Sequence, residues 1–180
     1  MTTRFGYACL NMTLAEQKPR ITCNRGMIKR TFKAKGIKYA SQLALQNTYD
    51  LIKIIKWNNQ NNIKVFRVTS CLFPWHSEYT FEQLPDWPQI LVNLSRAGTI
   101  ASEAGQRLSF HPGPFNILSS PKEHVVQNAY TDLEAHGKIM DYMGMPRNHW
   151  AKINIHIGAA YGDHKTAIER WCKNFDGLSD

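Results

Sequence analysis

Residues 106–113 read QRLSFHPG, and this stretch combines a strand pattern with an abrupt stop. Apolar Leu108 and Phe110 alternate with polar neighbours, which is the period of a β-strand. Pro112 cannot continue a sheet ladder and Gly113 permits a sharp turn, so the strand ends there. We therefore predict a strand over residues 106–110 with His111 at its exit.

Helical patterns flank this strand on both sides. Residues 87–104 place apolar side chains on one face of a predicted helix. On the other side, Ser120 is suited to cap a helix and Pro121 to its first turn, and the helical pattern stops before Gly144. The strand therefore lies between two helices in the sequence.

The same succession of strand, loop and helix occurs four times along the chain. Predicted strands cover residues 4–9, 63–68, 106–110 and 152–157, and predicted helices cover residues 39–59, 87–104, 121–143 and 163–175. Strands alternating with helices imply right-handed crossovers and a parallel sheet. The fold class is therefore α/β, and functional residues are expected where each strand gives way to the following loop.

The chain is basic, and much of the charge lies in one segment. Lys and Arg number 22 against 14 Asp and Glu, a net charge of +8 with a pI near 9.4. We predict a long basic loop over residues 16–38, with Gly26 and Gly36 as breaks and room for one short helix. It is either a solvated face or a phosphate-contacting surface. A polyanion is the partner that this charge favours, and nucleic acid is the first candidate.

The composition and the absence of certain motifs argue against several other classes of protein. A hydrophobic content of 43% in 180 residues is typical of one globular domain. The sequence has no GxGxxG, P-loop or GxSxG motif and no apolar run long enough for a membrane span. The cysteines form no CxxC pair and there is no signal-peptide pattern, so we expect an intracellular protein, cytoplasmic or nuclear, without membrane attachment.

Two histidines occupy equivalent positions at strand exits. His111 follows the third predicted strand and His156 lies near the end of the fourth. Imidazoles converging from neighbouring strands can share a Zn, Mn or Fe ion, and His76 or Glu78 on the second loop could add a ligand. The alternatives are a histidine pair doing acid–base work without metal, and a buried, structural His156. The remaining histidines are predicted to be surface residues: His124, His136, His149 and His164.

Aromatic residues also gather near the predicted strand exits: Tyr7, Trp75, Tyr79, Phe115 and Tyr161. Beside the basic loop they would form a cationic rim around stacking side chains, which suits nucleic acid. The alternative is that they pack between helices and sheet.

Four strand-end segments, taken together, resemble one known family. They are FGYACLNMTL (residues 5–14), FRVTSCLFP (66–74), LSFHPG (108–113) and IHIGAAYG (155–162). In order and approximate spacing they are similar to the UV damage endonucleases, and the resemblance extends from about residue 4 to residue 176.

The resemblance implies a fold and an activity. The fold would be a (β/α)8 TIM-type barrel, here with about the first four β/α units. The activity would be metal-dependent hydrolysis of duplex DNA on the 5′ side of cyclobutane dimers, 6–4 photoproducts and some abasic sites, which starts excision repair. The cofactor would be a group of divalent ions, most commonly Mn²⁺, with Mg²⁺ or Zn²⁺ as alternatives.

The resemblance also implies residue roles. His111 and His156 match metal ligands of the family, and Tyr7 and Asn11 match residues lining the lesion pocket. A further ligand falls on His76 or Glu78. Pro114 and Phe115 stand where the family often has a Gln-Tyr pair that probes the duplex. Phe115 can still act as a wedge, whereas Pro114 has no amide to offer, and Tyr161 is a further candidate DNA contact.

Four β/α units are half of a barrel that needs about 250 residues. We therefore expect residues 1–180 to form a single domain that is truncated on its C-terminal side and is weak or inactive alone. A second polypeptide could complete the barrel. The alternatives are a DNA-binding remnant without incision activity, and another TIM-barrel metalloenzyme of the abasic-site endonuclease or sugar-isomerase type.

Overall fold

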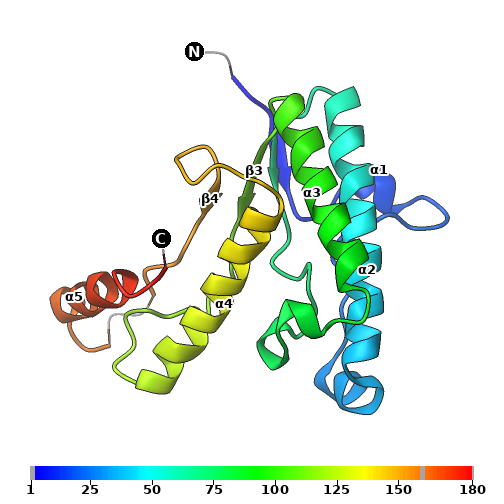
Figure 1. The fold of residues 1–180 in the computed structure, drawn as a ribbon. Helices are drawn as coiled ribbons and strands as arrows, with labels where there is room; N and C mark the ends of the chain where they lie inside the picture. Colours follow the sequence, from blue (N-terminus) through cyan, green and yellow to red (C-terminus); the bar gives the residue numbers. More distant parts are fainter. Residues whose placement is uncertain (1–2, 159–160, 180) are drawn as a thin grey trace.

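A computed structural model describes residues 3–158 and 161–179. Its centre is a parallel sheet in the order β1-β2-β3-β4 (Figure 1), formed by β1 (Gly6–Ala8), β2 (Val65–Arg67), β3 (Arg107–Phe110) and β4 (Lys152–Ile153). Tyr7 pairs with Phe66, which in turn pairs with Leu108. The predicted parallel sheet of sequentially ordered strands is confirmed.

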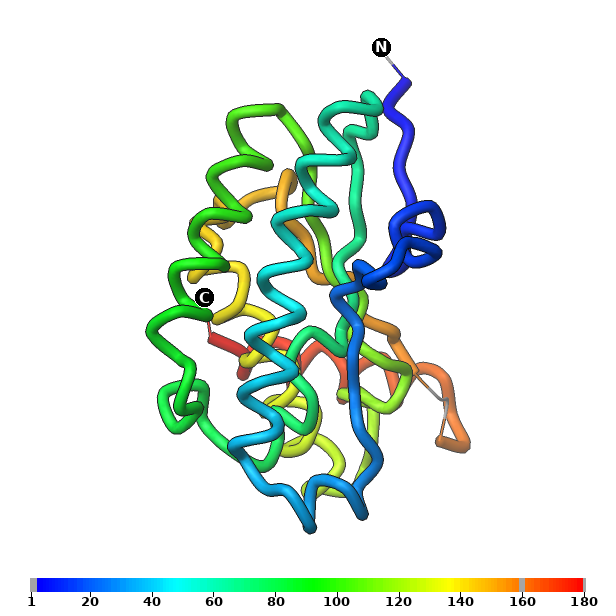
Figure 2. The backbone as a smooth tube through the Cα atoms, turned by 90° about the vertical axis from the view of Figure 1, so that its right-hand side faces the viewer, coloured from blue at the N-terminus to red at the C-terminus, as the bar shows by residue number. Residues whose placement is uncertain are grey.

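Helices follow each strand and cover one side of the sheet. They are α1 (Met12–Ala15), α2 (Lys29–Gln60), α3 (Trp87–Glu103), α4 (Glu123–Tyr142) and α5 (His164–Phe175), with 3₁₀ turns η1 (His76–Glu78) and η2 (Phe81–Gln83) between β2 and α3. Figure 2 shows α2 and α3 side by side, with the strands behind them.

The core forms where the helices meet the sheet. Phe66, Leu108 and Phe110 point from the strands into this layer and are fully buried. Opposite them lie fully buried aliphatic side chains of α2 and α3: Leu51, Ile54, Ile55, Ile90 and Leu94. Removing this apolar area from water is the main term that stabilises the fold.

The element α2 joins two helical stretches at Gly36, and the helix predicted for residues 39–59 is the second of them. Lys29 opens α2, and Gly36, with φ of 65°, interrupts the helical backbone as a kink. A left-handed φ costs glycine little, so the predicted break at Gly36 separates a short helix of about two turns from the long helix that follows. Phe32, one turn into α2, stacks on Trp75 with ring centroids 6.1 Å apart. This tertiary contact holds the short helix for which the predicted basic loop left room.

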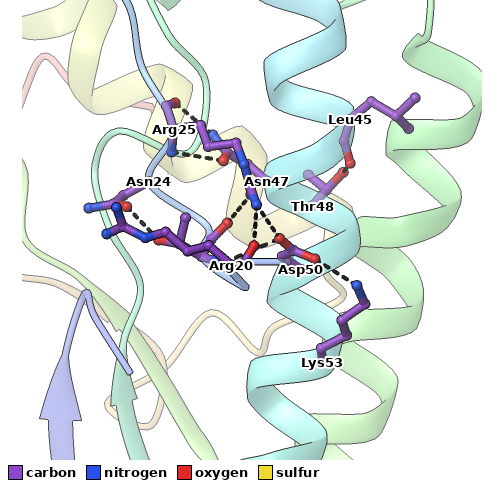
Figure 3. Close-up of polar contacts among 9 residues, drawn as sticks. Arg20, Asn24, Arg25, Leu45, Asn47, Thr48, Asp50 and Lys53 are labelled. Atoms are coloured by element: carbon purple, nitrogen blue, oxygen red, sulfur yellow. Dashed lines mark hydrogen bonds and ion pairs between the residues drawn. The ribbon is translucent and has the colours of Figure 1, made fainter. Parts of the chain in front are cut away.

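The segment before α2 is held against that helix by a buried carboxylate. Asp50 is almost inaccessible, and its oxygens lie 2.7 Å from Arg25 Nη2 and 2.9 Å from Lys53 Nζ (Figure 3). Asn47 Oδ1 accepts a hydrogen bond from the Arg25 backbone N–H, and Asn47 Nδ2 donates to the Leu72 carbonyl. Part of the positive charge of the segment is therefore neutralised inside the protein.

The fourth strand is shorter than predicted. The ladder between β3 and β4 ends at Ile153, and the backbone N–H of Asn154 donates a last bond to the Phe110 carbonyl at 2.9 Å. Residues 155–158 have no regular structure, so His156 lies beyond the strand. Ala159 and Ala160, quoted above as part of a strand-end segment, lie outside the described residues.

Within residues 3–158 and 161–179, no helix combines the length and apolar character that crossing a membrane requires.

Candidate active site at the strand exits

The strand exits and the basic start of α2 lie at the same end of the molecule. Helices that follow parallel strands run back against them, so α2 begins at the end of the molecule where the strands end, and its first turns lie beside the loop after β2 (Figure 1). Trp75 Nε1 in the β2 loop donates to the Met27 carbonyl at 2.9 Å. The basic helix start, which we define as Lys29, Arg30, Lys33, Lys35 and Lys38, is exposed.

The structure brings the two predicted strand-exit histidines together. The ring centroids of His111 and His156 lie 4.5 Å apart, with ring planes tilted by 39°. Burial, the neighbouring His156 and the Arg67 guanidinium all lower the pKa of His111. His111 is therefore held in the neutral form, which is the form that binds metal. We call these two residues the strand-end pair.

Arg67, the last residue of β2, is a feature that sequence reasoning missed. Its Nη1 lies 3.4 Å from His111 Nδ1, and its Nε is buried without a hydrogen-bond partner in the described part of the chain. A guanidinium presents several donors in a fixed plane that matches phosphate oxygens. Its place at a strand exit was a signal available in the sequence.

A second polar group lies between the β2 loop and α4. His76 Nε2 lies 2.7 Å from Asp132 Oδ1, and His136 Nδ1 lies 3.7 Å from Asp132 Oδ2. One nitrogen of each imidazole and one carboxylate oxygen lie within 4.8 Å of one another, so this group could hold a metal ion. We call it the His–Asp–His cluster.

The residues of this cluster shift one another's pKa values. Burial alone would lower the pKa of His76, but the hydrogen bond and charge of Asp132 raise it above the ordinary value. Burial alone would raise the pKa of Asp132, but the His76 hydrogen bond and both imidazoles lower it. Burial lowers the pKa of His136 despite the nearby carboxylate. The contact between His76 and Asp132 therefore favours the protonated imidazole and the ionised carboxylate, whereas the surroundings of His136 favour its neutral form.

The prediction that His136 lies on the surface is wrong. Its side chain is 1% exposed, and its ring meets Phe110 edge-on with centroids 5.2 Å apart. Leu133, His136 and Met140 follow one another at helical spacing on the buried face of α4. That spacing, together with Asp132 four residues before His136, was the signal available in the sequence. His124, His149 and His164 are exposed, as predicted.

His76 and Glu78, the two candidate ligands of the β2 loop, lie in different environments. His76 belongs to the His–Asp–His cluster, whereas the Glu78 side chain is exposed in η1. Within the described residues, neither joins the strand-end pair in a group of three ligands. A metal-binding role for Glu78 stays a prediction.

The cluster is linked to the loop after β3. Asn116 Nδ2 donates to Asp132 Oδ2 at 2.6 Å and to the Gly113 carbonyl at 3.1 Å. The His-Pro-Gly turn that carries His111 is thereby fastened to α4, and through His76 to the β2 loop.

Tyr7 and Asn11 also lie together, as predicted. Asn11 Nδ2 donates to the Tyr7 hydroxyl at 2.8 Å, and that hydroxyl donates to Asn58 Oδ1 at 2.6 Å. Burial raises the pKa of Tyr7, so its hydroxyl stays protonated. Asn11 is buried and its Oδ1 caps α1 by accepting from the Leu14 N–H. Both residues serve the interior network, and their contact with a lesion stays a prediction.

The aromatic residues divide into two groups. Trp75 stacks on Phe32, and Tyr79 donates its hydroxyl proton to the Pro74 carbonyl at 2.7 Å, so both are partly buried in contacts within the protein. Phe115 is 85% exposed, and Tyr161 is also exposed. Pro114 is exposed beside Phe115. The predicted stacking rim is therefore reduced to Phe115 and Tyr161.

A cleft of about 770 Å³ lies elsewhere, between α4, β4 and the segment after α5. Its lining includes Leu133, Met140 and Ile155 and none of the predicted site residues. The chemistry of the strand exits does not extend into it.

Comparison with known proteins identifies the family. The sequence model of the family described as UV-endonuclease UvdE matches residues 3–180. The UV-damage endonuclease of Schizosaccharomyces pombe is 36% identical over 179 residues, which cover 98% of this chain and 30% of that protein. The putative UV-damage endonuclease of Acanthamoeba polyphaga mimivirus is 34% identical, covering 98% of this chain and 53% of that protein. The UV DNA damage endonuclease of Bacillus cereus strain B4264 is 33% identical, covering 99% and 55%.

A solved structure confirms the fold class. The crystal structure of SacUVDE superposes with a TM-score of 0.83 at 25% identity, covering 99% of this chain and 57% of that one. The four parallel strands are thus part of a TIM-type barrel. The chain spans between about a third and just over half of the length of these relatives. Since the family model matches nearly the whole chain and the relatives agree in name and fold, this chain belongs to the UV-endonuclease UvdE family.

Proposed function

We propose that the protein cleaves duplex DNA on the 5′ side of UV photoproducts, and that this chain supplies the strand-exit part of the active site. The substrates are cyclobutane dimers, 6–4 photoproducts and some abasic sites. The observation that carries the proposal is the strand-end pair, whose rings lie 4.5 Å apart in a chain of this endonuclease family.

The strand-end pair fits a divalent metal ion. His111 is kept neutral by its surroundings, and the nearby His156 offers a second imidazole nitrogen. These two residues would hold the ion, for which we propose Mn²⁺, with Mg²⁺ and Zn²⁺ as alternatives. A bound ion would supply an activated water and stabilise the charge that develops on the phosphate. Arg67, at the exit of β2 beside His111, would bind a phosphate oxygen.

Other residues at this end suit a damaged duplex. The basic helix start is exposed and would bind the phosphate backbone. Photoproducts weaken stacking, so a protein can extrude the lesion at low cost, and the exposed Phe115 ring would fill the gap. Tyr161 would stack on a neighbouring base, and Tyr7 and Asn11 would line the lesion pocket.

The relatives are longer than this chain, and a complete barrel contains eight strands. We propose that further strands, from the same or a second polypeptide, complete the site. The 180 residues alone would then nick irradiated plasmid weakly or not at all. Efficient Mn²⁺-dependent nicking by this chain would contradict the need for further strands.

The proposal is tested by binding to a duplex with one cyclobutane dimer and to the same undamaged duplex. We expect tighter binding to the damaged duplex, strengthened by Mn²⁺. The double variant His111→Gln/His156→Gln should lose the Mn²⁺ effect, and His124→Gln, an exposed histidine of α4, should keep it. Equal affinity for the two duplexes would contradict the proposal.

A DNA-binding remnant is the second candidate function. The observation that favours it is that the strand exits supply only two converging imidazoles within the described residues, fewer ligands than a cluster of ions needs. It predicts lesion-selective binding that a chelator does not change, which is the opposite of the Mn²⁺ effect expected above.

A further inference from the structure

We propose that His76, Asp132 and His136 form a divalent-cation site of their own, separate from the strand-end pair, for an ion of the Zn²⁺ class. The three residues come from η1 and α4 and place two nitrogens and one oxygen within 4.8 Å. Two imidazoles and one carboxylate are a donor set that borderline cations such as Zn²⁺ and Co²⁺ prefer.

The outer hydrogen bonds are those of metal-binding histidines. His76 Nδ1 lies 3.2 Å from the Phe73 carbonyl, and His136 Nδ1 lies 2.7 Å from the Asp132 carbonyl. If each Nδ1–H donates to its carbonyl, each Nε2 lone pair is left for another partner. In metal-bound histidines the N–H of the second ring nitrogen commonly donates a hydrogen bond to a backbone carbonyl in this way.

Asp132 is oriented by the same kind of contact. Asn116 Nδ2 donates to its Oδ2 at 2.6 Å, which leaves Oδ1 facing His76 Nε2 at 2.7 Å. In the metal-free protein a proton lies between these two atoms. A cation would take the place of that proton, because metal ligands must be deprotonated.

His136 supplies an independent indication. Its side chain is 1% exposed, and its Nε2 is buried without a hydrogen-bond partner among the described residues. Buried polar atoms in native proteins are nearly always satisfied, so an atom left alone calls for an additional partner. A cation bound through Nε2 would be that partner, and the partial exposure of the His76 and Asp132 side chains would let it enter.

The bound ion would hold loops in place and would take no part in cleaving the phosphodiester bond. Asp132 reaches the Gly113 carbonyl through Asn116, and His76 sits in the β2 loop. An ion held by the three residues would therefore lock the two loops that flank His111. This inference does not depend on the proposed endonuclease activity.

The test is the number of Co²⁺ ions bound to the 180-residue chain by equilibrium dialysis, read together with the Co²⁺ absorption spectrum. The double variant His111→Gln/His156→Gln keeps the cluster intact and should retain one Co²⁺ that Zn²⁺ displaces. Adding Asp132→Asn or His136→Gln to that double variant should lower the affinity for the retained Co²⁺ by about 100-fold or more. Adding His124→Gln instead should leave the number of bound Co²⁺ ions and their affinity unchanged.

Circular dichroism of each variant checks that the fold is kept. Asp132→Asn preserves the shape of the side chain, so it serves if His136→Gln fails to fold. Absence of bound Co²⁺ in the double variant would overturn the inference and leave the cluster as an ion pair only. A retained ion that is insensitive to Asp132→Asn would overturn it as well. Neither result bears on lesion-selective DNA binding, which tests the proposed function separately.

Discussion

The imidazole rings of His111 and His156 lie 4.5 Å apart, although β4 ends three residues before His156. The contact is therefore made by loops that follow neighbouring parallel strands, at the end where functional groups of such folds gather. Arg67, at the exit of the next strand, stands beside His111. Three adjacent strands thus deliver nitrogen-bearing side chains to one place.

Phe115 is predicted to contribute to the affinity for damaged DNA and not to the stability of the fold. Its ring is 85% exposed, so Phe115→Ala removes almost no buried area. Loss of a base–aromatic contact should weaken binding to a dimer-containing duplex by about 2 kcal/mol, or roughly thirtyfold. Fluorescence anisotropy measures the affinity. Phe5→Ala, an exposed phenylalanine just before β1, is the matched control, and an equal effect of both variants would count against a specific role.

The basic helix start is predicted to contact phosphates. Arg30→Ala/Lys33→Ala should weaken DNA binding and reduce the slope of log affinity against log salt by about 2, because each phosphate contact contributes about 0.9. Lys56→Ala/Arg96→Ala, which removes exposed charges farther along α2 and on α3, should leave the slope nearly unchanged. Equal slopes for the two double variants would place the DNA elsewhere.

Asp50 is predicted to be a major stabilising residue. Asp50→Ala leaves Arg25 and Lys53 without their buried partner and should lower the free energy of unfolding by about 3 kcal/mol. Asp141→Ala removes a partner of Arg147 in an exposed ion pair and should cost less than about 1 kcal/mol. Denaturant unfolding compares the two, and similar losses would mean that the Asp50 contacts contribute little.

The cysteines should differ in reactivity. Burial raises the pKa of the Cys23 thiol to about 12, so Cys23 is protonated at pH 8 and lacks the nucleophilic thiolate. Cys71 and Cys172 are exposed. Iodoacetamide followed by mass spectrometry should label these two first and Cys23 only after unfolding. Rapid labelling of Cys23 in the folded chain would contradict its burial.

Much of the fold follows from sequence periodicity. The helix predicted over residues 87–104 appears as Trp87–Glu103, and the one over 121–143 appears as Glu123–Tyr142, because their apolar stripes face the sheet. The sequence left room for a short helix before Gly36 but did not fix its place, because Phe32 is stabilised there by stacking on Trp75, 43 residues away. Local pattern carries no information on such a contact.

The candidate site was predicted in part. His111 and His156 follow from the rule that parallel strands end at one edge of the sheet. The His–Asp–His cluster does not, because it joins a 3₁₀ turn to the buried face of a helix 56 residues further along the chain. A histidine on a helix is usually a surface residue, but His136 lies on the buried face of α4 between Leu133 and Met140. Where the stripe of a helix contains a histidine, burial beside a charged partner is the alternative to weigh.

The most direct test of the central claim is affinity cleavage of a damaged duplex with Fe²⁺ in place of Mn²⁺, which needs no hydrolytic activity from the 180 residues. Radicals generated at a bound iron cut the nearest DNA. The account predicts cuts centred within a few nucleotides on the 5′ side of a single cyclobutane dimer, lost in His111→Gln/His156→Gln and kept in His124→Gln. Cuts spread evenly along the duplex, or unchanged in the double variant, would contradict it.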